Sequence, residues 1–221
     1  LRSELHNHGA HLLDYEQLNE RQRLWVDNYF QTAIFPVLTP LAVDPAHPFP
    51  FVSNLSLNVA ALIDDPDTGQ RLLARVKVPQ TILPRFVAIP TDLAAEQSEA
   101  VHTAVPLEQV VAFNLGLLFP GMSIEGHYFF RVTRDADLEL RDLEADDLMI
   151  AIEQGLRKRR MGGEVVRLEV AEGMPLDVVE MLMDGMSVEE ADLYRVDGPL
   201  GLDDLFGLMG IPLANLKNES H

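Results

Sequence analysis

The chain has 221 residues, which suits one domain, or one domain with a fragment of another. Its 17 basic and 35 acidic residues give a formal net charge of -18, and such an acidic surface repels the phosphates of nucleic acid and of anionic lipid. Without cysteine, the chain cannot form a disulfide, a thiolate zinc site or a cysteine nucleophile. No apolar run reaches the ~20 residues of a membrane helix. We therefore expect a cytoplasmic protein that binds no nucleic acid and has no transmembrane segment.

The two ends of the sequence suggest a piece of a longer protein. The chain begins at Leu1 without a methionine, and its first residues lack the basic-then-apolar pattern of a signal peptide. Residues 1–7 predict the last part of a helix that ends at Gly9, because glycine commonly terminates helices. Residues 11–14 predict a short strand.

Residues 15–35 predict a longer helix, because large apolar side chains recur there mostly at helical spacings. Asn19 and Gln22 resemble a capping box, in which the side chains of the cap and of the residue three positions later bond to each other's backbone. Pro36 ends this helix in the prediction, since proline cannot continue a helical hydrogen-bond ladder.

A proline-rich arm follows, from Phe35 to Asn58, FPVLTPLAVDPAHPFPFVSNLSLN. Its five prolines argue against a helix and against a central strand. The arm is nevertheless too apolar for a solvated linker, so it predicts a rigid extended strap laid over a core or a partner. Phe35, Phe49 and Phe51 are its candidate interface anchors, since obligate interfaces are rich in apolar side chains.

A β-hairpin is predicted at the end of the arm. Apolar and polar residues alternate in 55–61, residues 64–69 form a strong turn signal, and residues 70–78 return as a second strand. Residues 85–89 lie between two prolines and predict an edge strand.

The remaining sequence mixes strands and helices without strict alternation. Helices are predicted at 106–119, 144–160, 176–183, 188–191 and 202–209, and strands at 124–132, 165–170 and 193–196. This order favours an α+β fold with a largely antiparallel mixed sheet and packed helices.

Three histidines near the start are the candidate metal ligands. His6, His8 and His11 have a spacing that could ligate zinc or nickel. They span a helix end, a glycine and a short strand, however, and no second-shell partner is evident. A surface or interface cluster is therefore favoured, and the sequence leaves open whether they bind metal.

Arg131 and Arg134 are candidate phosphate contacts. They lie beside Asp135 and Asp137 in RVTRDADLEL, where guanidinium groups could bind a phosphate or pair with carboxylates. Structural pairing is the favoured alternative. The basic run 157–160 is equally compatible with a phosphate site and with the end of a helix, where cations are favoured by the macrodipole.

Motifs of a complete active site are absent from the sequence. The chain has no G-x-x-x-x-G-K-[ST] loop, no G-x-G-x-x-G and no G-x-S-x-G elbow. His127 lies in an aromatic strand, where a core or interface role is favoured over catalysis. Taken alone, the residues describe a domain without a self-sufficient active site.

Four segments in order along the chain resemble bacterial polyphosphate kinase. They are the proline arm, LPRFVAIP (83–90), FFRVTRDADLEL (129–140) and LYRVDGPLGLDDL (193–205). The resemblance is to the middle, or head, domain of that family. It implies residues 1–13 as a remnant of the N-terminal helical domain, 14–205 as the head domain, and 206–221 as a linker towards C-terminal catalytic domains.

The resemblance implies that the parent protein is a kinase that reversibly transfers the terminal phosphate of ATP to polyphosphate, with Mg²⁺ and through a phosphohistidine. In the family, the phosphorylated histidine and most nucleotide and magnesium contacts lie in the C-terminal domains, so no catalytic, ATP-binding or metal residue is assigned to this chain. The fragment alone is predicted to be inactive and to hold no cofactor.

For this region the resemblance implies a structural role in a dimer or tetramer. The head domain supports dimerisation and helps to wall the tunnel where ATP and polyphosphate meet, with Arg131 and Arg134 as candidate tunnel-facing contacts. Its fold in the family is similar to that of phosphohistidine phosphatases, and the full enzyme is cytoplasmic or membrane-associated. The alternative is a stand-alone phosphate-binding or phosphohistidine-phosphatase-like domain that uses Arg131, Arg134 and a histidine such as His127.

Overall fold

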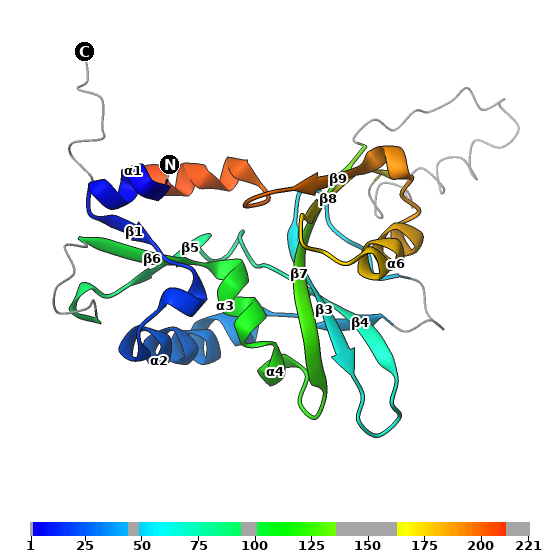
Figure 1. Cartoon of the computed structure of the whole chain (residues 1–221), viewed down its shortest axis with the longest axis horizontal. Helices are drawn as coiled ribbons and strands as arrows, with labels where there is room; N and C mark the ends of the chain where they lie inside the picture. Colours follow the sequence, from blue (N-terminus) through cyan, green and yellow to red (C-terminus); the bar gives the residue numbers. More distant parts are fainter. Residues whose placement is uncertain (1, 44–48, 94–100, 136–162, 211–221) are drawn as a thin grey trace, which may run out of the picture.

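The computed structural model describes residues 2–43, 49–93, 101–135 and 163–210. In these residues the chain is α+β, as the sequence predicts (Figure 1). The predicted helix at 144–160 and the basic run 157–160 lie outside the described residues. Within the described part, no helix is both long enough and apolar enough to span a membrane.

The strands form two sheets, whereas a single sheet is predicted from the sequence. The larger has the order β2-β4-β3-β7-β8-β9, with antiparallel neighbours except for the parallel β8–β9 pair. The smaller has the order β1-β6-β5, with β1 parallel and β5 antiparallel to β6. The strands are β1 (Ala10–Leu12), β2 (Leu41–Val43), β3 (Leu57–Asp64), β4 (Arg71–Lys77), β5 (Phe86–Ile89), β6 (His102–Pro106), β7 (Ser123–Arg134), β8 (Val165–Ala171) and β9 (Leu193–Val196).

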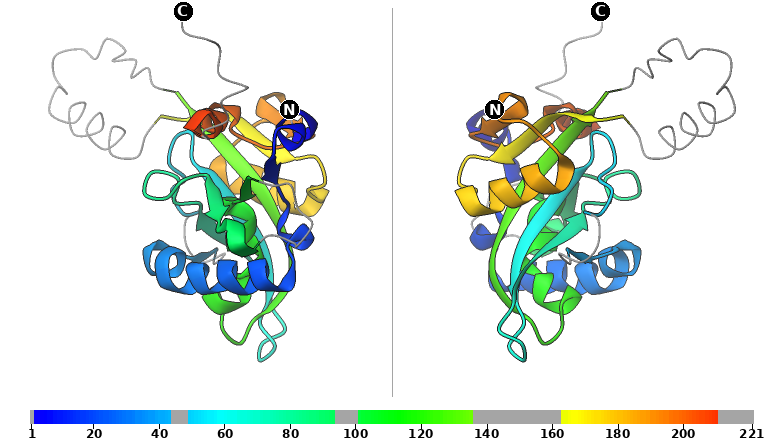
Figure 2. Two further views of the ribbon diagram at one scale, coloured as in Figure 1. Left: turned by 90° about the vertical axis from the view of Figure 1, so that its left-hand side faces the viewer. Right: turned by 90° about the vertical axis from the view of Figure 1, so that its right-hand side faces the viewer.

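Helices cover the larger sheet on both faces. On one face α6 packs against β8, and on the other α3 packs against β3 and α4 against β7 (Figure 2). The α-helices are α1 (Arg2–Asn7), α2 (Glu20–Tyr29), α3 (Leu107–Phe113), α4 (Leu115–Leu118) and α6 (Leu176–Met186). The shorter helical turns are η1 (Tyr15–Gln17), η2 (Phe30–Ile34), η3 (Phe35–Val37), η4 (Thr91–Leu93), η6 (Glu190–Asp192) and η7 (Leu202–Gly210).

Two hydrophobic cores follow from this arrangement. One lies between the two sheets and includes residues of α2 and α3, with Val26, Val59 and Val105 almost fully buried. The other lies between the larger sheet and α6, with Phe130 and Leu182 at its centre. The larger sheet therefore has a core on each face, so a charged side chain on either face must find partners within the protein.

Several local structures predicted from the sequence are confirmed. Asn19 caps α2, with Gln22 completing the capping box, and β3 and β4 pair as the predicted hairpin. β5 lies at the edge of the smaller sheet. The predicted helix 106–119 is instead divided into α3 and α4, because the backbone leaves helical geometry at Asn114.

The proline arm differs from its prediction at both ends. Residues Phe35–Val37 form a 3-10 turn, which is compatible with Pro36 because the first turn of a helix needs no proline N–H. β2 is an extended edge strand that pairs with β4. Leu57 and Asn58, the last residues of the arm, belong to β3, which lies between β4 and β7. The prolines thus exclude a central strand only as far as Pro50.

Candidate functional site

Two glycines lie in the loop 197–204, which follows β9 and includes the first residues of η7. Gly198 has a φ of 130° and Gly201 a φ of 66°, a left-handed region that favours glycine. A Cβ at Gly201 would also lie 3.2 Å from the carboxylate of Asp204 and 3.4 Å from Nε of Arg131. The glycines therefore allow the loop to pass close to charged groups.

Arg85, directly before β5, holds this loop from the smaller sheet. Its Nε and Nη2 donate to the two carboxylate oxygens of Glu108 at 2.9 and 2.6 Å, and Nη1 donates to Asp204 at 2.8 Å. Nη2 also donates to the carbonyl of Leu200 at 3.0 Å, and Nη1 to that of Gly201 at 3.4 Å. The side chain of Arg85 is 5% exposed. These bonds use all five N–H donors of the guanidinium.

Arg131, on β7, holds the same loop from the larger sheet. Its Nη1 donates to Glu169 at 3.1 Å, its Nη2 to Asp203 at 3.3 Å, and its Nε to the carbonyl of Leu55 at 3.3 Å. We call Arg85, Arg131 and their carboxylate partners the arginine clamp. It joins β5, β7 and the start of η7, so the loop cannot move without breaking ion pairs to both sheets.

The end of the proline arm is held by other cations. Arg134 donates from Nε to the carbonyl of Val52 and from Nη1 to that of Gly163, both at 2.7 Å. Its guanidinium carbon lies 4.5 Å from the ring centre of Phe51, a cation–π contact. Its backbone N–H donates to Asn54 Oδ1 at 2.8 Å.

Two cations of β4 hold the same arm residues. Arg75 is 6% exposed; its Nη1 donates to the carbonyl of Phe51 at 2.6 Å and its Nε to Asn58 Oδ1 at 3.0 Å. Lys77 Nζ lies 3.2 Å from Ser53 Oγ. Burial lowers the pKa of Arg75 and of Arg134, because a charged group loses hydration there. We call Arg75, Lys77 and Arg134 the cation cradle.

The backbone of the arm is strained at Leu55, which lies just after the residues held by the cation cradle and contacts Arg131 of the arginine clamp. Leu55 has a φ of 58°, which is rare for a residue with a Cβ. Its N–H donates to the carbonyl of Val132 at 2.8 Å, and its own carbonyl accepts from Arg131. Such a conformation costs about 1–3 kcal/mol and persists where neighbouring bonds enforce it.

The three N-terminal histidines do not all lie together. The rings of His6 and His11 stack with their centres 4.0 Å apart, and His8 lies 3.9 Å from Glu4. Burial, and then the neighbouring His6, lower the pKa of His11. In the described ranges no group of three or more histidines and carboxylates has metal-binding geometry.

His127 is not combined with Arg131 and Arg134 in one site. It packs against the rings of Phe113 and Phe129, with centres 5.6 and 6.0 Å away, and burial lowers its pKa. Arg131 follows four residues later on the same face of β7, about 13 Å along the strand. Arg134 contacts the arm on the opposite face.

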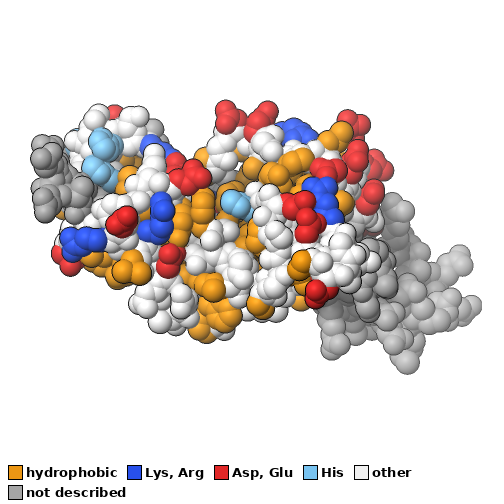
Figure 3. Space-filling model, turned by 60° about the horizontal axis from the view of Figure 1, so that its bottom comes forward, with side chains coloured by type: hydrophobic (Ala, Val, Ile, Leu, Met, Phe, Trp, Pro, Cys, Tyr) orange, Lys and Arg blue, Asp and Glu red, His pale blue; other side chains and the backbone are white. Residues whose placement is uncertain are grey.

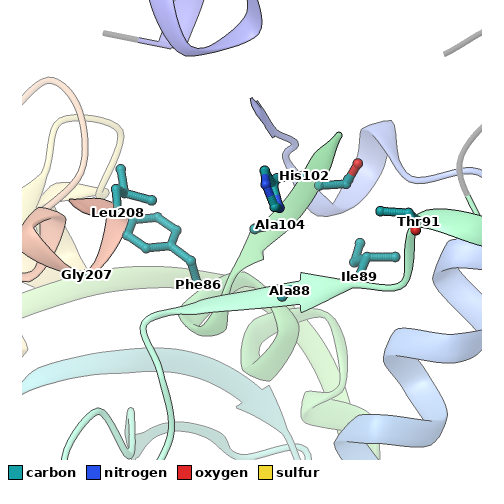
Figure 4. Close-up of a pocket in the computed structure, with 9 residues that line it drawn as sticks. Phe86, Ala88, Ile89, Thr91, His102, Ala104, Gly207 and Leu208 are labelled. Atoms are coloured by element: carbon teal, nitrogen blue, oxygen red, sulfur yellow. The ribbon is translucent and has the colours of Figure 1, made fainter. Parts of the chain in front are cut away.

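A small pocket lies on the smaller sheet beneath η7 (Figure 4). Its volume is about 140 Å³, and Phe86, His102 and Leu208 are among its lining residues. Nucleotide-sized ligands need pockets of roughly 300–1,000 Å³. The pocket is therefore too small for a nucleotide.

Comparison with known proteins gives the class of the chain. The family model described as "Polyphosphate kinase middle domain" matches residues 21–208. The chain therefore belongs to the polyphosphate kinase middle domain family.

Relatives named polyphosphate kinase match the chain over its whole length. The protein of Prochlorococcus marinus (strain MIT 9313) is 75% identical and that of Parasynechococcus marenigrum (strain WH8102) 73% identical, each over 221 residues. In both cases the match covers 100% of this chain and 31% of the relative. The chain thus spans about a third of the length of these curated relatives.

A solved structure shows the same fold. The crystal structure of polyphosphate kinase from Porphyromonas gingivalis matches with a TM-score of 0.77 and 22% identity, covering 100% of this chain and 31% of that one. At this identity the likeness extends to the fold alone.

The ion pairs of Arg85 with Glu108 and Asp204, and the buried position of Arg75, were not predicted from the sequence. A signal was present, since Arg75 stands inside the apolar run LLARVKV and Glu108 inside PLEQVVAF. A charge at an otherwise apolar position indicates a buried partner. The sequence does not show which residues pair with each other, because partners can be far apart along the chain: Arg85 and Asp204 are separated by 119 residues.

Proposed function

We propose that this chain is the non-catalytic middle, or head, domain of a polyphosphate kinase. The complete enzyme would transfer the terminal phosphate of ATP reversibly to polyphosphate, with Mg²⁺ and through a phosphohistidine on another domain. The observation that carries the proposal is the family match over residues 21–208, in a chain that spans only 31% of its relatives.

The charge distribution favours a structural role for this domain over a catalytic role. Phosphoryl transfer depends on cations placed around a polyanion. This chain has a net charge of -18, and the donors of Arg85 are already occupied by protein groups. Such a domain is better suited to position neighbouring domains than to carry out phosphoryl transfer by itself.

We propose that the arm takes part in subunit contacts within a dimer or tetramer. Phe35 is 43% exposed and Phe51 47% exposed, which leaves both rings accessible to a partner. Phe49 is partly buried, and its ring packs against Gly185 of α6, which fixes this part of the arm to the helix. Figure 3 shows hydrophobic side chains gathered along the middle of the face that includes α2 and α4, a further apolar surface for such contacts.

Of the two candidate tunnel-facing arginines, Arg134 is the better suited to contact phosphate. Arg131 already has two carboxylate partners, Glu169 and Asp203. Arg134 bonds only to neutral carbonyl groups in the described part of the chain. We keep both as proposed contacts in the complete enzyme.

The finer organisation is proposed along the same lines. Residues 1–13 would be a remnant of the N-terminal domain, 14–205 the head domain and 206–221 a linker, in a cytoplasmic or membrane-associated enzyme. The proposed likeness to the phosphohistidine-phosphatase-like fold can be tested by superposition on such a protein.

An activity assay tests the proposed role directly. The purified 221-residue chain, given ATP and Mg²⁺, should make no polyphosphate, whereas the complete polypeptide should. Robust synthesis by the chain alone would contradict the proposal. A stand-alone phosphohistidine phosphatase is the competing function; release of phosphate from a phosphohistidine peptide by this chain would favour it.

A further inference from the structure

The cation cradle differs in its partners from four arginines that are paired with carboxylates. Arg71, Arg85, Arg131 and Arg167 each pair with at least one carboxylate. Among the described residues, no carboxylate lies within ion-pair distance of Arg75, Lys77 or Arg134. In the same part of the chain, Arg23 and Arg195 also donate only to backbone carbonyl groups, but the cradle brings three cations to successive residues of the arm. In a chain with twice as many acidic as basic residues, three neighbouring cations that have no carboxylate partner among the residues described by the structure are unexpected.

The three cations converge on three successive residues. Arg75 bonds to Phe51, Arg134 to Val52 and Lys77 to Ser53, so that the cations approach the arm from β4 on one side and β7 on the other. The larger sheet fixes their spacing, because β3 separates β4 from β7. The cradle is therefore built on rigid strands rather than on a loop.

The cradle retains unused hydrogen-bond donors. A guanidinium carries five N–H donors and an ammonium three. Among the described residues, the side chains of Arg75 and Arg134 each make two hydrogen bonds and Lys77 makes one. All of these acceptors are neutral, so within the described part of the chain the positive charges have no carboxylate partner.

An anion could reach this group. Phe51 and Asn54 are exposed, and Lys77 and Arg134 are partly exposed at the surface of the arm. The lowered pKa values of Arg75 and Arg134 reflect lost hydration, and a bound anion would offset this cost.

We propose that Arg75, Lys77 and Arg134 form a binding site for the oxyanions of a phosphate chain. A phosphate group offers several strong acceptors, which suit the fork of a guanidinium and the point charge of an ammonium. The choice of inorganic polyphosphate as the ligand rests on the proposed function. The site itself rests on the charges and their partners.

Titration of the 221-residue chain with tripolyphosphate by isothermal calorimetry tests the proposal. At low salt we expect saturable binding that weakens as salt is added, because the contacts are ionic. Lys77→Gln should weaken binding by about tenfold, the loss expected for one charged hydrogen bond of ~1.5 kcal/mol. Arg134→Gln should weaken it at least as much.

Arg71→Gln is the matched control. Arg71 lies on β4 like Lys77 and carries the same charge, but it pairs with Glu125 and Asp177. Its removal should leave tripolyphosphate binding within about twofold. Since Arg134 also anchors the arm, thermal unfolding of each variant is measured, and Lys77→Gln, the milder change, decides the outcome if Arg134→Gln is unstable.

Three results would overturn the site: no saturable binding to the wild-type chain, equal loss in Arg71→Gln and Lys77→Gln, or equal affinity for sulfate and tripolyphosphate. The first removes the site, the second indicates a general charge effect, and the third indicates binding of any anion. None of these bears on whether the complete enzyme needs this domain. Conversely, tripolyphosphate binding would stand even if the chain proved to have a phosphatase activity of its own.

Discussion

The arginine clamp and the cation cradle both place cations against the protein, but they differ in the charge of the partners. The clamp pairs its arginines with carboxylates, whereas in the described residues the cradle cations bond to neutral oxygen atoms. In the clamp, Arg85 is buried beside the buried Glu108 and also pairs with the partly exposed Asp204, and all of its donors are used. In the cradle, Arg75 is buried to a similar degree, but its partners in the described ranges are a backbone carbonyl and an amide oxygen, both neutral. The comparison teaches that burial alone does not reveal the role of an arginine; the charge of its partners does.

Breaking the clamp should give the largest effect. Arg85→Met leaves Glu108 and Asp204 without their cation, and removal of one partner from a buried pair typically costs about 3–5 kcal/mol. Urea unfolding should show this loss of stability. Arg71→Met, which breaks exposed pairs, should have a much smaller effect. Equal effects would mean that the clamp does not stabilise the fold.

A smaller loss is expected from Gly201→Ala. The left-handed φ of Gly201 costs a residue with a Cβ about 1–2 kcal/mol, and the new methyl group would press on Asp204 and Arg131. Thermal unfolding measures the change. Gly116→Ala in α4, where a Cβ meets no atom within 4 Å, should leave stability unchanged or raise it slightly. If both variants behave alike, the loop geometry is not under constraint.

On the cradle side, Ser53→Ala should separate stability from anion binding. It removes the neutral partner of Lys77, at a cost of at most about 1 kcal/mol because the bond is partly exposed. Tripolyphosphate affinity should be kept or increased, since Lys77 is then unoccupied. Ser123→Ala, at the exposed start of β7, is the control. A fall in affinity with Ser53→Ala would show that Ser53 itself binds the anion.

The smallest effect concerns pH. Burial lowers the folded-state pKa of His127 below its ordinary value of 6.5, so the unfolded chain takes up a proton first as the pH falls. His127 should therefore have no effect on stability well above pH 6.5 and should reduce stability below it. Melting temperatures between pH 8 and 5 should fall less for His127→Gln than for the wild type. Parallel curves would contradict this assignment.

Local structure could be predicted where the signals lie close together in the sequence. The capping box of Asn19 and Gln22 and the 64–69 turn between β3 and β4 each depend on a few adjacent residues. The division into two sheets could not be predicted, because β1 pairs with β6, some 90 residues away. The same holds for the candidate site: Arg131 was identified from a motif, but its partners Leu55, Glu169 and Asp203 come from three distant segments.

The clamp also has a consequence for the order of folding. Arg85 and Asp204 are separated by 119 residues, so their ion pair closes a loop that includes β5 to β9, with strands of both sheets. Closing this loop costs conformational entropy that is not offset until other contacts have formed. The pair should therefore form late, after the rate-limiting step, and its loss should speed unfolding while leaving the folding rate almost unchanged. The clamp would then set how long a folded molecule lasts rather than how quickly one is made.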